Sequence, residues 1–266
     1  MEIRYALITG ASSGMGLQYT LQLASRGYGV IIVSNRHEEN IKAAETVCCT
    51  MYDVDVRIID ADLTDSESPE KIYTIIKQWN IKVDVLVSNA GILLFSTFLR
   101  TPMADLERIV SLHCIAPVKL IRLFADDMAS RRHGYILIVS SSTAWMPYPT
   151  ISHYSATKAF LKNFARSLWY EMRDKGVGVT AVFPGAVDTP LFELSSGKRN
   201  ILRKLSIMQS AETTVRTALK ALFRKQHLCI PGLFTKTIVL LCIITPSIIL
   251  LPFLKLPFVK NILQKY

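Results

Sequence analysis

The alternation of short apolar runs with longer, helix-like segments is the feature that most limits how this chain can fold. Nearly continuous apolar strands separated by helix-length segments are typical of a parallel sheet with helices on both faces. The pattern therefore predicts a doubly wound α/β fold. The seven runs are YALIT from Tyr5, VIIVS from Val30, VRIID from Val56, VDVLVS from Val83, YILIVS from Tyr135, VGVTAVF from Val177 and LCI from Leu228.

Nothing in the sequence suggests a linker within residues 1–235, so we expect one domain over 1–235 followed by a tail over 236–266. The clearest helix is predicted over residues 155–175, and Gly176 is well placed to end it. Its expected apolar stripe has i, i+4 spacing and consists of Phe160, Phe164, Leu168 and Met172.

A glycine-rich turn, TGASSGMG from Thr9, stands between the first predicted strand and a helical pattern. Such a turn lets backbone approach a pyrophosphate, and the following helix N-terminus offers free N–H groups. A plain surface turn is the alternative, but the strand before and the helix after favour a dinucleotide site in a Rossmann fold. The residues expected there are Gly10, Ser12, Ser13, Gly14, Met15 and Gly16.

The end of the second strand indicates which dinucleotide is preferred. A carboxylate there would bind the ribose 2′-hydroxyl of NAD, but this chain has no carboxylate before Glu38. Arg36 can instead offer a guanidinium to a 2′-phosphate, unless it is simply a solvated surface residue. NADP(H) is therefore favoured over NAD(H).

Tyr154 and Lys158 are four residues apart at the start of the long predicted helix, so both side chains lie on one face. An ammonium near a phenol favours phenolate, which predicts that Tyr154 exchanges a proton with a ketone or an alcohol. Ser141 precedes Tyr154 by 13 residues and follows a strand, where ligands bind in doubly wound sheets. Tyr73 and Lys77 have the same spacing without such a context.

With these residues the sequence resembles the short-chain dehydrogenase/reductase family from about Tyr5 to Gly232. The resemblance rests on an ordered set of motifs, namely TGASSGMG at Thr9, Asp62-Leu63, Asn89-Ala90-Gly91, Ser141, Tyr154 with Lys158, and Pro184-Gly185 followed by Thr189. The family's fold is the doubly wound sheet already predicted. Its activity is hydride transfer between a nicotinamide cofactor and a carbonyl or alcohol.

The resemblance implies a role for each matching residue. Tyr154 would be the general acid/base, Ser141 would hydrogen-bond the substrate oxygen, and Lys158 would bind the nicotinamide ribose. Asp62 would meet the adenine, Asn89 the cofactor edge and Thr189 the nicotinamide carboxamide. The expected cofactor contacts beyond the glycine turn are Arg36, Asp62, Leu63, Asn89, Ala90, Gly91, Tyr154, Lys158, Pro184, Gly185, Val187 and Thr189.

One position departs from the family's pattern. Many members carry an Asn on the helix after Asn-Ala-Gly, which supports a water in the proton relay. In this frame His113 stands at the Asn position and is counted among the catalytic residues, with Ser111 as the competing choice if the register slips. A neutral imidazole could still hold the water, whereas a protonated one would oppose Lys158.

The formal net charge of +10 is concentrated in the last quarter of the chain. Residues 195–266 carry 12 Lys+Arg against Glu212 alone, while residues 1–194 have a net charge of −1. The same quarter holds an uncharged run from Thr237 to Leu254, flanked by Lys236 and Lys255. Basic and strongly apolar residues together favour an anionic membrane surface over nucleic acid, and no nucleic-acid motif is present.

As a helix, this run would reach about 27 Å, slightly less than a hydrocarbon core of roughly 30 Å. Pro246 and Pro252 interrupt it, so a kinked segment in one leaflet is favoured over a straight span. A subunit-interface helix in a homo-oligomer is the alternative. The resemblance to the family implies a substrate lid over residues 189–210. Membrane contact favours a lipophilic ketone, and the tail is a loose match to those of family members that act on 3-oxoacyl, 3-ketosphinganine or steroid carbonyls.

The remaining composition excludes some classes of protein. We expect the protein in the cytoplasm, because its five cysteines include no Cys-x-x-Cys pair and its strand-like start has no signal-peptide pattern. The C-terminal tail would hold it at the periphery of a membrane or insert into one. Five scattered histidines predict no metal site. A reductase or dehydrogenase is the favoured function. A cofactor-binding sensor or scaffold without turnover is the alternative, which the intact Ser141, Tyr154 and Lys158 disfavour.

Overall fold

A computed structural model describes residues 3–50, 54–145, 150–190 and 208–245. Its centre is a seven-stranded sheet in the order β3-β2-β1-β4-β5-β6-β9, and every neighbouring pair is parallel. All seven predicted strands are present, so the predicted doubly wound α/β fold is confirmed. The strands are β1 (Tyr5–Thr9), β2 (Gly29–Ser34), β3 (Val56–Asp60), β4 (Val83–Ser88), β5 (Gly134–Val139), β6 (Val177–Val182) and β9 (Leu228–Cys229).

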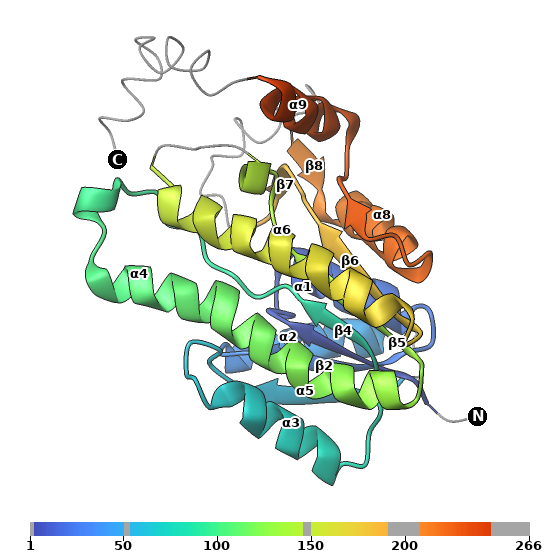
Figure 1. The fold of residues 1–266 in the computed structure, drawn as a ribbon. Coiled ribbons are helices and arrows are strands. Elements are labelled where there is room, and N and C mark those ends of the chain that lie inside the picture. The colour runs from blue at the N-terminus through green and yellow to red at the C-terminus, as the bar shows by residue number, and fades with distance from the viewer. Residues whose placement is uncertain (1–2, 51–53, 146–149, 191–207, 246–266) are drawn as a thin grey trace.

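Helices cover both faces of the sheet (Figure 1). One face packs against α3 (Ser68–Gln78), α5 (Ala116–Ser130) and α6 (Ser152–Arg173). The other face packs against α1 (Gly14–Ala24), α2 (His37–Cys49) and α8 (Ala211–Phe223). Residues of β1, β2, β4 and β6 are buried throughout, which explains why these strands are apolar at nearly every position.

The strand order reverses between β1 and β4, which are neighbours in the sheet although 73 residues lie between Thr9 and Val83. Loops from adjacent strands diverge at such a switch point, and a crevice opens at the carboxyl ends of the strands. The glycine turn follows β1 and the Asn-Ala-Gly segment follows β4. The topology therefore brings both motifs to the same edge.

The long helix α6 begins three residues before the predicted start and ends two before the predicted end. Its buried face is shifted from the expected stripe. Leu161 and Ala165 are buried with Met172, whereas Phe160 is exposed and stacks on Phe164 with ring centroids 6.1 Å apart. The shift places Tyr154 and Lys158 on the buried face, because they share it with Leu161 and Ala165.

A π-helical segment, Ser111–Ile115, joins α4 (Met103–Val110) to α5. Such an insertion into an α-helix is frequent at functional sites, because it redirects the side chains that it carries. Three of its residues, Leu112, His113 and Cys114, are buried.

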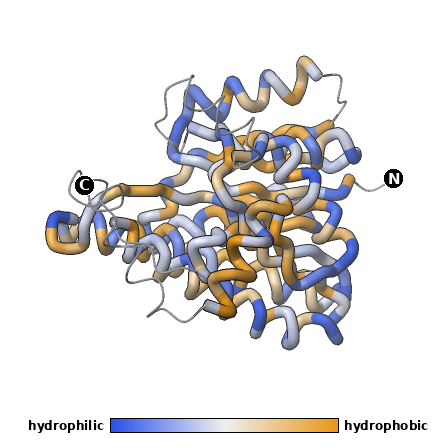
Figure 2. Tube along the Cα trace, turned by 90° about the horizontal axis from the view of Figure 1, so that it is seen from above, coloured by the Kyte–Doolittle hydropathy of each residue, from blue (hydrophilic) through white to orange (hydrophobic). Residues whose placement is uncertain are grey.

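The carboxyl edge of the sheet carries a small parallel pair, β7 (Ala186–Asp188) and β8 (Met208–Ser210), and then α9 (Leu233–Ile244). The predicted boundary after residue 235 falls within α9. Figure 2 looks onto the molecule from above, where α9 lies in Figure 1, and colours hydrophobic residues orange. In the part of the chain that the structure describes, no helix has both the length and the apolar character needed to cross a membrane.

Candidate active site

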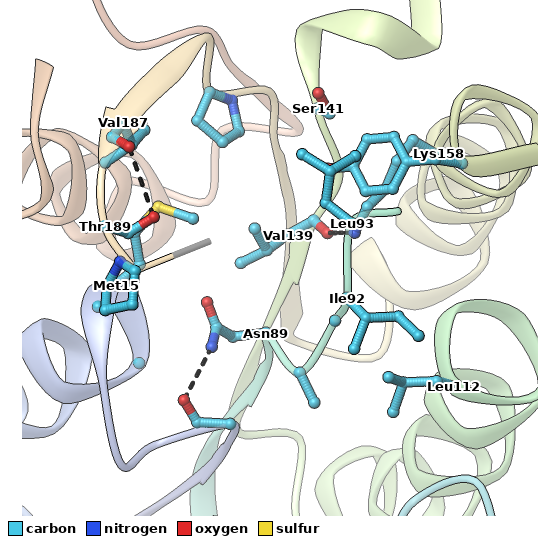
Figure 3. A pocket seen from close by; sticks show the side chains of 18 of the residues that line it. Met15, Asn89, Ile92, Leu93, Leu112, Val139, Ser141, Lys158, Val187 and Thr189 are labelled. Carbon is cyan, nitrogen blue, oxygen red and sulfur yellow. Dashed lines mark hydrogen bonds between the residues drawn. The ribbon is translucent and has the colours of Figure 1, made fainter. Parts of the chain in front are cut away.

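A cavity of about 880 Å³ opens at the carboxyl ends of the strands. It is lined by the glycine turn, the segments after β2, β3 and β4, the start of α6 and the segment around β7. Figure 3 shows Met15, Val187 and Thr189 on one side of this cavity and Leu93, Ser141 and Lys158 on the other. The predicted contacts come from segments far apart in the sequence, which converge at this edge of the sheet.

The glycine turn is shaped as the sequence predicts. Gly10 has a φ of +63°, which L side chains rarely adopt, and it starts the turn after β1. Gly16 lies so close to the start of the turn that an added Cβ would be 1.8 Å from the carbonyl oxygen of Gly10. Gly16 therefore has room for backbone only, and the first residues of α1 line the cavity, where helix N-terminal N–H groups are suited to bind a diphosphate.

Thr9 joins the glycine turn to the Asn-Ala-Gly segment. Its hydroxyl oxygen accepts hydrogen bonds from the backbone N–H groups of Asn89 and Ala90, both at 3.0 Å. The Asn89 side-chain amide in turn donates to the carbonyl of Thr9 at 3.0 Å and to that of Gly10 at 3.3 Å. Asn89 thus fixes the spacing of the two loops, and Ala90 and Gly91 line the cavity beside it.

Asp62 and Leu63, which follow β3, line the cavity where the adenine is expected. The Asp62 carboxylate accepts hydrogen bonds from the Thr64 backbone N–H at 2.9 Å and from the Thr64 hydroxyl at 2.8 Å. These bonds hold the pKa of Asp62 below its usual value. Asp62 is therefore ionised and held in one orientation, as an acceptor of hydrogen bonds.

Arg36 lines the cavity after β2, but its guanidinium is also engaged by a residue that the sequence analysis did not single out. Its Nη1 donates to both carboxylate oxygens of Glu39 at 3.0 Å. The Ser12 hydroxyl of the glycine turn donates to the same carboxylate at 3.4 Å. Both members of the ion pair are more than 40% exposed, so the pair is weak and can open for a phosphate.

Ser141, Tyr154 and Lys158 are all buried and all line the cavity. The Lys158 ammonium lies 5.5 Å from the centre of the Tyr154 ring and donates a hydrogen bond to the carbonyl of Val139 at 3.1 Å. The neighbouring Ser140 hydroxyl donates to the carbonyl of Lys158 at 2.8 Å and ties β5 to α6. The structure therefore brings together three of the four residues that the sequence predicts as catalytic.

Protonation at this site is governed by burial. Burial raises the pKa of Tyr154 to about 12, and its hydrogen bond with the Ser141 side chain acts in the opposite direction. Burial also lowers the pKa of Lys158 to about 8. The lowering of the Tyr154 pKa that the sequence suggested is not seen, because the removal of both groups from water dominates. At neutral pH Tyr154 is consequently a phenol with a proton to donate.

His113 lies against the predicted catalytic residues, with its ring centroid 5.6 Å from that of Tyr154. Its Nε2 accepts the backbone N–H of Ile92 at 3.0 Å, and its Nδ1 is 3.0 Å from the hydroxyl of Thr157. Since that hydroxyl donates to the carbonyl of Tyr154 at 2.8 Å, it accepts the Nδ1 proton. Burial, with Lys158 second, lowers the pKa of His113 well below its usual value, so the ring is neutral.

The register question at this position has a structural answer. The π-helical segment turns His113, rather than Ser111, toward Tyr154. Both ring nitrogens of His113 already have protein partners, so the side chain holds the Ile92 loop against α6.

The residues after β6 complete the cavity. Pro184, Gly185, Val187 and Thr189 line it, and Thr189 is buried with its hydroxyl donating to the carbonyl of Val187 at 3.4 Å. The Thr189 side chain also lies against the glycine turn, since a Cβ on Gly14 would be 3.2 Å from it. The rest of the predicted lid, residues 191–207, lies outside the described residues.

Tyr73 and Lys77 show what the same spacing does elsewhere. They lie on α3, where the Tyr73 hydroxyl and the Lys77 ammonium both bond the carboxylate of Asp127, at 3.1 and 3.4 Å. Neither residue lines the cavity. This pair ties α3 to α5.

The apolar lining of the cavity was not predicted. Leu93, Leu94 and Phe95 follow the Asn-Ala-Gly segment, and Ile151 precedes α6. Ile151, Ile92 and Leu93 pack with Tyr154 and Ile109 in one apolar cluster, which places this lining beside the predicted acid. Phe234, Thr235 and Ile238 add a wall from α9, far along the chain. The apolar run after Asn-Ala-Gly is the signal that could have indicated this wall.

The arrangement can hold a dinucleotide along the carboxyl edge and present a hydroxyl pair, Ser141 and Tyr154, to a carbonyl in an apolar surrounding. Within the described ranges, no three His, Cys, Asp or Glu side chains are grouped so as to hold a metal ion.

Comparison with known proteins gives a consistent result. The family model "short chain dehydrogenase" matches residues 4–200. The 17-beta-hydroxysteroid dehydrogenase type 3 of Mus musculus is 33% identical over 199 residues, which are 73% of this chain and 64% of that protein. The very-long-chain 3-oxoacyl-CoA reductase of Rattus norvegicus is 31% identical over 220 residues, 81% of this chain and 67% of that protein. The chain thus spans about two thirds of the length of these relatives.

A solved structure adds a comparison that includes a cofactor. The short-chain dehydrogenase from Sphingobium yanoikuyae in complex with NADPH superposes with a TM-score of 0.77 at 27% sequence identity. The superposition covers 87% of this chain and 89% of that one.

Proposed function

The chain belongs to the short-chain dehydrogenase/reductase family of oxidoreductases, and we propose that it transfers hydride between NADP(H) and a lipophilic ketone or secondary alcohol, acting as a reductase. One observation carries the proposal. Ser141, Tyr154 and Lys158 are buried in the cavity that the glycine turn lines, and an apolar cluster packs directly against Tyr154.

The residues present fit a nicotinamide dinucleotide, because the turn at Gly16 has space for backbone only and Asp62 is a fixed acceptor. When bound, the cofactor supplies or accepts the hydride. Tyr154 donates its phenolic proton to the developing alkoxide, and Ser141 hydrogen-bonds the same oxygen. Lys158 remains largely protonated at neutral pH and would hold the nicotinamide ribose. A protonated Tyr154 at neutral pH supports reduction rather than oxidation.

Arg36 supports the choice of NADP(H). Arg36 lines the cavity, and its guanidinium forms an exposed pair with Glu39, whose place a 2′-phosphate can take as a bidentate partner. The NADPH bound to the Sphingobium yanoikuyae protein supports the same choice.

The apolar lining and the relatives both support the proposed substrate class. The names of the mouse and rat relatives refer to a hydroxysteroid and to a very-long-chain 3-oxoacyl-CoA. Leu93, Leu94, Phe95 and Ile151 offer apolar surface suited to such a bulky carbonyl compound. We include 3-ketosphinganine as a third candidate of the same kind.

The test is NADPH oxidation by the purified protein with a panel of steroid ketones, 3-oxoacyl-CoA compounds and 3-ketosphinganine. We expect Tyr154→Phe to lower kcat by about a thousandfold or more while the Kd for NADPH stays within about twofold, because only the proton is removed. Tyr73→Phe is the matched control and should have no effect on kcat. Activity of Tyr154→Phe close to that of the parent, or NADPH binding without turnover of any ketone, would count against the proposal.

A further inference from the structure

Helix α9 has one buried face and one exposed face. The inner face packs on the catalytic domain through Thr235 and Val239, which are 5% and 2% exposed. The same face supplies Phe234, Thr235 and Ile238 to the wall of the cavity. α9 is therefore a part of the site.

α9 makes a close contact with the cofactor side of the cavity. Gly185 lies in the turn after β6, and an added Cβ there would be 2.5 Å from the hydroxyl oxygen of Thr235. α9 also packs against the short helix Ser142–Trp145, which directly follows Ser141. The inner face of α9 is thus held between the Pro-Gly turn and the segment that carries Ser141.

The outer face of α9 is apolar and exposed to solvent. Leu233 is 81% exposed, and four further aliphatic residues lie between 48% and 63%, namely Leu240, Leu241, Ile243 and Ile244. The neighbouring helix α8 shows the usual arrangement, because its exposed residues are all polar, namely Glu212, Thr213, Arg216, Thr217 and Lys220. A run of exposed aliphatic residues on one helix marks an interaction surface.

Charge identifies the occupant of this surface. Residues 195–266 carry a net charge of +11, whereas residues 1–194 carry −1, and Lys236 is exposed within α9 itself. An anionic lipid surface would bind both the apolar outer face of α9 and the basic residues of this part of the chain. A second copy of the chain would oppose one such basic segment to another. Twelve residues of helix reach about 18 Å, less than the roughly 30 Å of a hydrocarbon core, so α9 suits a position along the interface.

We propose that the outer face of α9 binds an anionic membrane surface while its inner face forms the cavity wall, so that lipophilic substrate enters the cavity from the lipid. The delivery step rests on the function proposed above. The binding step does not depend on it.

The binding step is tested by co-flotation of the purified protein with vesicles of phosphatidylcholine, with and without phosphatidylserine. We expect the parent protein to float with the anionic vesicles, and less at high salt without complete loss, because salt screens the charges but not the apolar contact. The triple variant Leu240→Ser, Leu241→Ser, Ile244→Ser should bind at least about tenfold more weakly. Tyr170→Ser is the control, since Tyr170 is exposed on the distant end of α6.

A second variant guards against misfolding of the first. Lys236→Glu changes one exposed charge, and it should weaken flotation with anionic vesicles only. NADPH binding by each variant shows that the domain is folded. Equal flotation of parent and triple variant, or no flotation of the parent with either vesicle, would overturn the proposal. So would a fall in oligomeric size of the triple variant while the parent ignores vesicles, since α9 would then be an interface between copies.

The delivery step needs a second measurement. The triple variant should reduce a water-soluble ketone as fast as the parent protein does, but reduce a steroid ketone carried in vesicles at least about threefold more slowly. An equal loss of rate with both ketones would show that the substitutions disturb the fold rather than the delivery of substrate. If no ketone is turned over at all, the proposed function fails, while the flotation result still decides whether α9 binds lipid.

Discussion

The two parts of the cavity are held together in different ways. Around the glycine turn, single polar groups have several directional partners. The Thr9 hydroxyl bonds two N–H groups, and the Asn89 amide bonds two carbonyls. Beside Tyr154, apolar side chains from the loop after β4 and from Ile151 meet by packing, and α9 adds a further, mainly apolar part of the lining.

This difference indicates which changes each part tolerates. Directional bonds and close backbone contacts fix positions, so a small change near the glycine turn should abolish cofactor binding. Aliphatic surfaces adapt their packing, so a change there should alter substrate preference by a modest factor. We therefore expect the largest effects at the glycine turn and the smallest at the apolar wall.

Replacement of Gly16 by Ala should have the largest effect. The new Cβ would be 1.8 Å from the Gly10 carbonyl oxygen, so the turn must move. We expect the Kd for NADPH, measured by fluorescence titration, to rise by about a hundredfold or more. Gly27→Ala is the control, because a Cβ at Gly27 meets nothing within 4 Å and only the positive φ of 78° is strained. Comparable NADPH binding by Gly16→Ala and Gly27→Ala would show that the turn is not rigid.

Lys158→Met should separate activity from stability. We expect kcat to fall by about a hundredfold, since the ammonium that would hold the ribose is gone. At pH 7 the variant should unfold at higher urea concentration than the parent, because holding the buried ammonium costs roughly 3 kcal/mol.

The pH dependence of that difference has a definite sign. Burial lowers the pKa of Lys158 from 10.5 to about 8, so the unfolded chain binds more protons between these values. The stability of the parent therefore rises with pH over this range, and the advantage of Lys158→Met should shrink above pH 8. Lys77→Met is the control on the exposed lysine of α3 and should leave kcat unchanged. A stability difference that is constant with pH would mean that burial does not lower the pKa of Lys158 in the folded protein.

Arg36 and Glu39 should have opposite effects on cofactor choice. Arg36→Ala should raise the KM for NADPH by about tenfold and leave that for NADH nearly unchanged, since only NADPH carries the 2′-phosphate. Glu39→Gln removes the carboxylate that pairs with Arg36 and should lower the KM for NADPH by about twofold to threefold. Steady-state kinetics with both cofactors provides the measurement. Equal changes in the KM for NADH and for NADPH would show that Arg36 does not contact the 2′-phosphate.

Ile238→Ala should have the smallest effect. The residue forms part of the cavity wall on α9, so we expect the ratio of kcat/KM between a bulky and a small ketone to change by about threefold to tenfold. The Kd for NADPH should not change. Leu241→Ala, on the outer face of the same helix, is the matched control. Loss of NADPH binding in Ile238→Ala would mean that the two parts of the cavity are not separable.

The sequence was sufficient to predict the parts of the site that lie next to a strand end. The glycine turn, Asn89 and Ser141 follow strands β1, β4 and β5, and the parallel sheet brings all of these ends to one edge. The helical spacing of Tyr154 and Lys158 then places both on one face. These inferences need only local periodicity and the rule for parallel sheets.

Other features depend on tertiary packing and could not be predicted. The rise in the Tyr154 pKa reflects its burial, which depends on packing against Ile151 and Ile109. The partners of His113 depend on a π-helical segment, and no motif in the sequence marks it. The motif for cofactor choice concerns only the end of the second strand, so it does not indicate Glu39. The Glu39 carboxylate reaches Arg36 from α2, which follows that strand.

The close contact between Gly185 and Thr235 has a thermodynamic consequence. It places a turn that lines the cofactor site directly against a helix whose other side faces outward. Linkage between two such sites is reciprocal. Any factor by which a ligand in the cavity changes the affinity of the outer face of α9 must equal the factor by which occupancy of that face changes the affinity of the cavity.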